Sequence, residues 1–241
     1  MKLLEICCFN LASVLLAQKM GAQRIELCAD ASGGGTTPSW GLIELARKKL
    51  EIPLYPIIRP REGDFLYTEE EFEIMLQDTM QCRRLGCDGV VIGILQKNGT
   101  VDKERCIRLV EAAYPMGVTF HRAFDWTYQP FDALEDIISL GCERILTSGQ
   151  KQNAKESTGL IAELISRADQ RIIIMPGAGI RGSNISEIAN QTRADEFHSS
   201  ARMTMHSHMQ FIQPSMEETP GYPMPDSGEI KTMLTALRAL D

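Results

Sequence analysis

Short apolar runs alternate with amphipathic stretches along the whole chain. Two of the runs, Val90–Ile92 and Ile172–Ile174, are apolar at every position. Strands that are buried on both faces of a parallel sheet have this pattern. Eight strands are therefore predicted, at Leu3–Phe9, Arg24–Cys28, Leu54–Arg59, Gly89–Leu95, Val118–Phe124, Arg144–Ser148, Ile172–Pro176 and Glu196–Ser200.

The stretches between these runs carry apolar residues at helical spacing. In the clearest case Phe72, Met75 and Leu76 recur on one helix face, with Thr68 as a capping residue before them and Gly86 as a stop signal after them. The predicted helices are Leu11–Met20, Trp40–Leu50, Glu69–Leu85, Lys103–Tyr114, Phe131–Leu140, Ala154–Ala168, Asn184–Gln191 and Gly228–Leu240.

Eight strands that alternate with helices predict a single-domain α/β protein, the (β/α)8 or TIM barrel. A doubly wound open sheet shows the same alternation, but it usually has fewer strands and a glycine-rich first turn, and the turn Cys7–Asn10 contains no glycine. We place the barrel core in residues 1–202. For residues 203–241 we expect an irregular segment and then a helix that packs back on the barrel.

Composition narrows the functional class. The net charge of −7 over 241 residues argues against a nucleic-acid-binding protein, although local arginines can still form a positive pocket. The chain has no apolar run of membrane-spanning length, and its start lacks the features of a signal peptide. Most of the seven cysteines lie inside apolar segments, where free thiols of a reducing compartment are typical. We therefore expect a cytoplasmic protein that binds neither nucleic acid nor a membrane.

Ionisable residues gather where the predicted strands end, which is where TIM barrels carry their active sites. The candidates for acid–base chemistry are Glu5, Glu26, His121, Asp125 and His198. One interpretation makes Glu5 or Glu26 a general acid or base beside a histidine. The other places both glutamates in interior salt bridges with Arg59 and Arg122. Both interpretations stay open.

A second group of residues suits an anionic ligand. Its members are Arg59, Arg61, Arg122, Ser148, Gly177 and Gly179. Arginine forks match carboxylate and phosphate oxygens, and the glycine-rich turn after the seventh strand offers backbone N–H groups before a helix. The alternative for this turn is a tight connection that uses glycine only for its backbone angles.

Three cysteines on neighbouring strands, Cys7, Cys8 and Cys28, are candidate Cu(I) ligands, because thiolates are soft donors. Alternation along the strand puts Cys7 on the same side as Glu5 and Cys8 on the opposite side. The simpler interpretation is that these cysteines are buried small hydrophobes. The segment Met203–Met209 also has a copper-like composition, whereas no Cys-x-x-Cys pair supports a zinc finger.

Several motifs together resemble the CutC family, in chain order from residue 2 to about residue 201. They are Leu4–Cys8, Arg24–Cys28, Gly34–Ser39, Pro56–Phe65, Thr119–Asp125, Leu146–Gln150 and Glu196–Ala201. The resemblance implies a cytoplasmic TIM barrel, a homodimer, a role in copper homeostasis and Cu(I) bound through cysteine. No enzymatic reaction is established for that family. Two functions therefore remain open: a Cu(I)-binding homeostasis protein, or an enzyme that acts on a small anionic (phosphorylated or carboxylated) metabolite at the mouth of the barrel.

Overall fold

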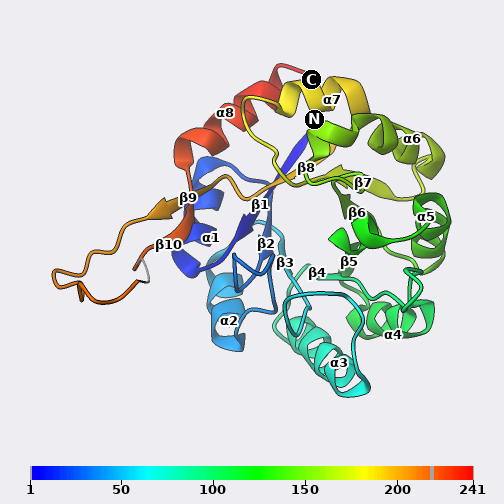
Figure 1. The fold of residues 1–241 in the computed structure, drawn as a ribbon, viewed down its shortest axis with the longest axis horizontal. Coiled ribbons are helices and arrows are strands. Elements are labelled where there is room, and N and C mark those ends of the chain that lie inside the picture. The colour runs from blue at the N-terminus through cyan, green and yellow to red at the C-terminus, as the bar shows by residue number, and fades with distance from the viewer. Residues whose placement is uncertain (1, 218–219, 241) are drawn as a thin grey trace.

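The chain folds as a barrel of eight strands surrounded by helices (Figure 1). The computed structural model describes residues 2–217 and 220–240. The barrel strands are β1 Leu3–Cys8, β2 Arg24–Leu27, β3 Leu54–Pro56, β4 Gly89–Ile92, β5 Gly117–Phe120, β6 Arg144–Thr147, β7 Ile173–Pro176 and β8 Glu196–Ser199. The α-helices are α1 Leu11–Met20, α2 Trp40–Lys49, α3 Glu69–Arg84, α4 Lys103–Ala113, α5 Pro130–Ser139, α6 Thr158–Ala168, α7 Ile185–Thr192 and α8 Ser227–Arg238.

The strands form two parallel four-stranded halves, in the order β3-β2-β1-β8 and β4-β5-β6-β7. A parallel bridge between Ile57 and Val91 joins β3 to β4, and β7 lies beside β8 to complete the circle (Figure 1). The predicted (β/α)8 barrel is confirmed. As in every such barrel, the carboxyl ends of the strands meet at one mouth.

Alternation along each strand separates an inner from an outer layer. On β1, Leu4, Ile6 and Cys8 point outward into the large apolar cluster under the helices, whereas Cys7 belongs to a smaller cluster inside the barrel. Helix starts follow the predicted signals: Thr68 forms a capping box with Glu71 at the start of α3.

Several predicted elements have other bounds than the sequence indicated. The third and fourth strands end at Pro56 and Ile92, before the predicted Arg59 and Leu95. The fifth strand does not reach Phe124, because a 3-10 turn occupies Arg122–Trp126 and the ring of His121 accepts a hydrogen bond from the N–H of Ala123. The sixth helix starts at Thr158, after a separate 3-10 turn at Ala154–Ser157.

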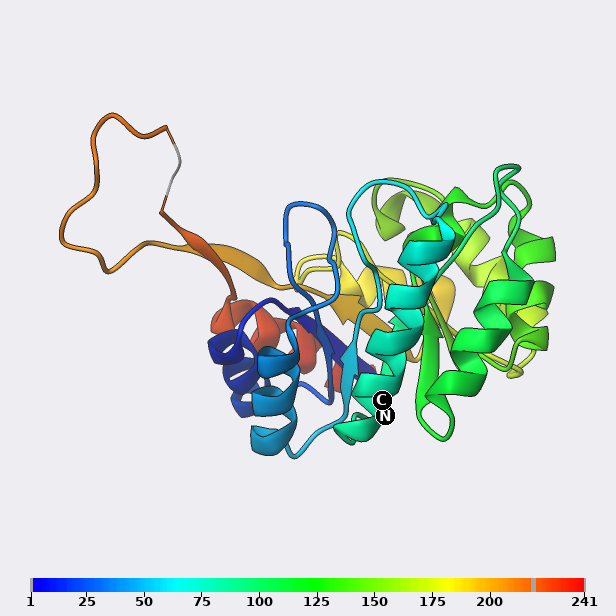
Figure 2. The same ribbon diagram turned by 90° about the horizontal axis from the view of Figure 1, so that it is seen from below.

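The segment after the barrel is more regular than predicted. Strands β9 (Arg202–Met205) and β10 (Tyr222–Pro225) form an antiparallel hairpin that projects sideways from the barrel (Figure 2). Helix α8 packs against α1 and α7. The hairpin loop exposes Met209 and Phe211 to solvent.

Among residues 2–217 and 220–240, no helix has both the length and the apolar character that a membrane crossing requires.

Candidate functional site

A network of buried ion pairs fills the barrel interior near the amino ends of the strands. Arg24 pairs with Glu5 and, at 2.6 Å, with Glu196. Arg144 also contacts Glu196, at 2.5 Å. One of the two open interpretations paired both glutamates with Arg59 and Arg122. Among the described residues Glu5 pairs instead with Arg24 from the adjacent strand, and Glu26 has no arginine partner.

His198 lies between the two inward-facing glutamates. Its Nδ1 is 2.7 Å from Glu5 Oε1, and its Nε2 is 3.7 Å from Glu26 Oε2. Burial alone would lower the pKa of His198, but Glu26, Cys7 and Glu5 together raise it well above 6.5. The imidazole therefore carries a proton at neutral pH.

The two glutamates respond differently to burial. Burial would raise the pKa of Glu5, but Arg24 and His198 outweigh burial and lower that pKa to about 2. The pKa of Glu26 is raised, because burial and the nearby Glu5 charge exceed the opposing effect of His198. Of the two carboxyl groups, Glu26 therefore keeps its proton to a higher pH than Glu5 does.

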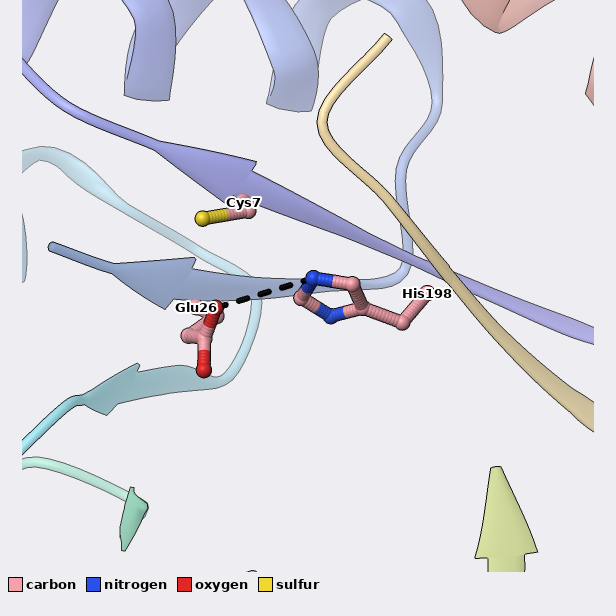
Figure 3. Close-up of side chains that lie close together, drawn as sticks. All are labelled: Cys7, Glu26 and His198. Carbon is pink, nitrogen blue, oxygen red and sulfur yellow. Dashed lines mark ion pairs between the residues drawn. The ribbon is translucent and has the colours of Figure 1, made fainter. Parts of the chain in front are cut away.

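Two thiols adjoin this charged group. The Sγ atoms of Cys7 and Cys28 are 3.6 Å apart. Cys7, Glu26 and His198 each offer one donor atom, and these atoms lie within 4.8 Å of one another (Figure 3). The hydrogen bond shared with Cys28 and burial raise the pKa of Cys7, and burial raises the pKa of Cys28 to about 12. Both thiols are therefore protonated at neutral pH, and a metal ion has to displace their protons in order to bind.

Cys8 does not belong to this group. It is completely buried in the outer apolar cluster, on the opposite face of β1 from Cys7. Of the three cysteines predicted as possible copper ligands, the structure brings only Cys7 and Cys28 together, in keeping with the alternation along the strand.

His121 is a buried, neutral donor. It is 3% exposed, and its Nδ1 accepts the N–H of Ala123 at 3.1 Å. Burial and the neighbouring Arg59 charge lower its pKa to about 3. The proton of the neutral ring is therefore on Nε2, which has no hydrogen-bond partner among the described residues.

The three predicted arginines have different environments. Arg59 is buried and donates to the carbonyl oxygens of Gly33, Gly35 and Gly63 at 2.7–2.8 Å. Contrary to the prediction, Arg61 does not line the cavity. It turns away from the mouth and pairs with Glu71 at 2.6 Å. Arg122 reaches the mouth while pairing with Asp125 at 2.8 Å.

Asp125 and Ser148 fasten the loop after β6. Asp125 accepts hydrogen bonds from the backbone N–H of Ser148 and from that of Gln150, and Ser148 Oγ contacts both Asp125 and the carbonyl of Lys151. The backbone N–H of Gly177 donates a hydrogen bond to the carbonyl oxygen of Thr147. These three predicted site residues are occupied with internal bonds, and none of them lines the cavity.

A cavity of about 340 Å³ opens at the carboxyl ends of the strands. Predicted residues that line it are Cys7, Glu26, Arg59, His121, Arg122, Gly179 and His198. Sequence reasoning missed Arg181, Arg202 and Phe65, which line it too. Arg181 and Arg202 follow the ends of β7 and β8 by a few residues, so their short distance from two predicted strand ends is the signal that points to them.

The fold and the site together define a TIM barrel with an ionisable cavity at its carboxyl end. The sequence identifies the family within this fold. Residues 2–203 match the CutC family, and the chain belongs to that family. A CutC family protein from Chromobacterium violaceum is 50% identical over 210 residues, which are 87% of this chain and 85% of that protein. One from Xylella fastidiosa is 45% identical over 97% of this chain and 88% of its own length.

Solved structures agree with this assignment. The structure of CutC from Streptococcus agalactiae, whose name assigns it to copper homeostasis, superposes with a TM-score of 0.80 at 33% identity. It covers 83% of this chain and 99% of its own. Phosphoribosylanthranilate isomerase from Thermotoga maritima has a TM-score of 0.61 at 14% identity, over 99% of this chain and 100% of its own, and shows the shared barrel fold alone.

Proposed function

We propose that this protein binds Cu(I) inside the mouth of the barrel, with Cys7 and Cys28 as ligands. The observation that carries the proposal is the 3.6 Å separation of their Sγ atoms, on neighbouring strands and facing the same side. Two thiolates at this distance can contact one metal ion without a large movement of the backbone. Cu(I) favours such soft donors over carboxylates.

His198 is the proposed third ligand. Its ring lies against both Cys7 and Glu26, and imidazole suits copper as well as zinc. Metal binding has to displace protons from the two thiols and from His198, whose pKa values are all raised. The expected Cu(I) affinity therefore increases with pH, since protons compete with the metal for every ligand.

The family relationship supports this function from a second direction. The related Streptococcus agalactiae protein carries copper homeostasis in its name. All seven cysteines are buried and unpaired, as in proteins of a reducing compartment, and we propose a cytoplasmic location. The homodimer that the resemblance implies remains a prediction, which light scattering on the purified protein would check.

The decisive experiment is a titration of the reduced protein with Cu(I) against a competing chelator. The double variant Cys7→Ser/Cys28→Ser should bind Cu(I) at least about tenfold more weakly than the wild type, a loss of about 1.4 kcal/mol. Cys8→Ser is the matched control, because it removes a thiol from the adjacent position but from the outer face of β1. Equal binding by the double variant and the wild type would reject these two ligands, and absence of binding by all three proteins would reject the copper function.

A further inference from the structure

We infer that the cavity at the mouth of the barrel is also a binding site for a small organic anion, one that carries a phosphate or carboxylate group on a short apolar body. The proposal does not depend on copper. It rests on residues that follow β3 and β5, on the loop after β7 and on the start of β9, whereas the proposed copper ligands lie on or directly after β1, β2 and β8.

The first observation is an excess of positive charge in the cavity wall. Four arginines line it: Arg59, Arg122, Arg181 and Arg202. Within residues 2–217 and 220–240, only Arg122 of these four has an ion pair with a carboxylate. Among the described residues that line the cavity, Glu26 is the one acidic side chain, and it contacts His198. A positive cavity in a chain of net charge −7 points to an anionic ligand.

The second observation is the way in which Arg59 is held. Its two terminal nitrogens are fixed by three backbone carbonyls, which orient the guanidinium but do not neutralise its charge. Its Nε is buried and has no hydrogen-bond partner among the described residues. Arginine is the side chain best suited to planar recognition of carboxylate or phosphate oxygens.

The third observation is the unpartnered N–H of His121. Its Nδ1 accepts a backbone hydrogen bond, so Nε2 is a donor, and the residue lines the cavity. A buried donor without a partner is costly in a folded protein. An oxygen atom of a bound ligand would satisfy it.

Gly93 makes room for this histidine. A Cβ atom at Gly93 would lie 2.4 Å from both Cε1 and Nδ1 of His121. The imidazole therefore sits in a close-fitting place that only glycine leaves free. This packing holds the ring in place but gives its Nε2 no hydrogen-bond partner among the described residues.

Apolar side chains complete the cavity. Phe65 lies 5.0 Å from the ring of His121 and 5.0 Å from the Arg59 guanidinium, measured from its ring centroid. Phe9, Ile57 and Leu146 also line the wall. These surfaces suit the carbon skeleton of a ligand, and a volume of about 340 Å³ suits a small metabolite.

Calorimetric titration of the metal-free, reduced protein tests the site. The probes are inorganic phosphate, glycerol 3-phosphate and succinate, with sodium chloride at matched ionic strength as the reference. We expect at least one organic probe to bind with a Kd of about 1 mM or tighter, and more tightly than inorganic phosphate. Preference for glycerol 3-phosphate or for succinate identifies the anionic group as phosphate or carboxylate. If no probe gives heat beyond that of chloride, the proposal is wrong.

Variants locate the bound anion. Arg59→Met and His121→Phe should each weaken binding about tenfold or more. Arg202→Met does the same from the exposed rim, where a failure to fold is not a concern. Arg61→Met is the matched control, because this arginine lies two residues from Arg59 but outside the cavity. Equal weakening by Arg61→Met and Arg59→Met would place the anion elsewhere and overturn the proposal.

The single variant Cys28→Ser separates this proposal from the copper function, because Cys28 is a proposed Cu(I) ligand that does not line the cavity. It should weaken Cu(I) binding and keep the anion affinity of the wild type. Loss of anion binding in this variant, with the fold intact by circular dichroism, would overturn the proposal of an anion site that is independent of the copper ligands.

Discussion

The Nδ1 of His198 lies 2.7 Å from Oε1 of Glu5, although 193 residues separate them in the chain. The contact exists because β1 and β8 are adjacent in the barrel, with Glu5 and His198 directly opposite each other in the register. Closing the barrel therefore brings the first strand and the last strand together. That closure assembles the charged group at the centre of the site.

Replacing Glu5 by glutamine should destabilise the protein by about 3 kcal/mol, because it leaves the buried charges of Arg24 and His198 without their shared partner. The free energy of unfolding in urea at pH 7 measures the effect. The matched control is Glu44→Gln, which breaks the exposed pair with Lys48 and should cost less than about 1 kcal/mol. Similar small losses in both variants would contradict the central role assigned to Glu5.

Stability should decrease in acid because of His121. Its folded pKa of about 3 lies below the ordinary value of 6.5, so between these values the unfolded chain binds a proton that the folded protein does not. Stability from this group is thus present above the unfolded pKa and is lost as pH falls towards the folded pKa. His121→Asn removes this dependence. From about pH 6 to pH 4, wild type should lose up to about 1.4 kcal/mol per pH unit more than the variant.

Urea unfolding of both proteins across this pH range provides the measurement. His198 is present in both and cancels in the difference. Parallel pH profiles of wild type and His121→Asn would show that the folded imidazole is not held neutral.

Gly93→Ala should disturb the mouth, because the added Cβ would meet the His121 ring at 2.4 Å. We expect a loss of about 1–3 kcal/mol in the free energy of unfolding. The control is Gly41→Ala in α2, where a Cβ would meet nothing within 4 Å, and where the change should stabilise by up to about 1 kcal/mol. If Gly93→Ala matched Gly41→Ala, the close fit around His121 would be disproved.

Replacing residues 206–221 by a two-residue Asn-Gly turn should leave the barrel intact. This loop lies beyond residues 2–203, which match the family, and its apolar side chains at Met209 and Phe211 are exposed. We expect a change within about 0.5 kcal/mol in the free energy of unfolding, together with unchanged Cu(I) affinity. Loss of Cu(I) binding in the shortened protein would indicate that the metal site lies in the segment Met203–Met209 and not inside the barrel.

The fold was predictable because its signals are local. Continuous apolar runs such as Val90–Ile92 have to be buried on both faces, and capping residues such as Thr68 mark where helices begin. The fifth strand shows where apolar periodicity fails. It ends early because the ring of His121 accepts the N–H of Ala123, only two residues further on, and the alternation of apolar and polar residues does not report such a side-chain bond.

The candidate site was predictable only in part. Strand alternation correctly separated Cys7 from Cys8, since side-chain direction has a period of two along a strand. Position at a strand end did not reveal that Arg61 turns away to Glu71 while Arg59 turns inward. Long arginine side chains have several accessible directions, and the choice depends on partners that the neighbouring loops supply.

The sequence by itself determined the barrel, its strand order and the set of ionisable groups at the strand ends, because periodicity and residue type are properties of short segments. Tertiary structure decided which of these groups meet. Glu5 pairs with Arg24 and His198, and the Nε2 proton of His121 has no acceptor in the part of the chain that the structure describes. The physical reason is that charges and hydrogen bonds act over a few ångströms, so their partners are set by which strands closure of the barrel makes neighbours.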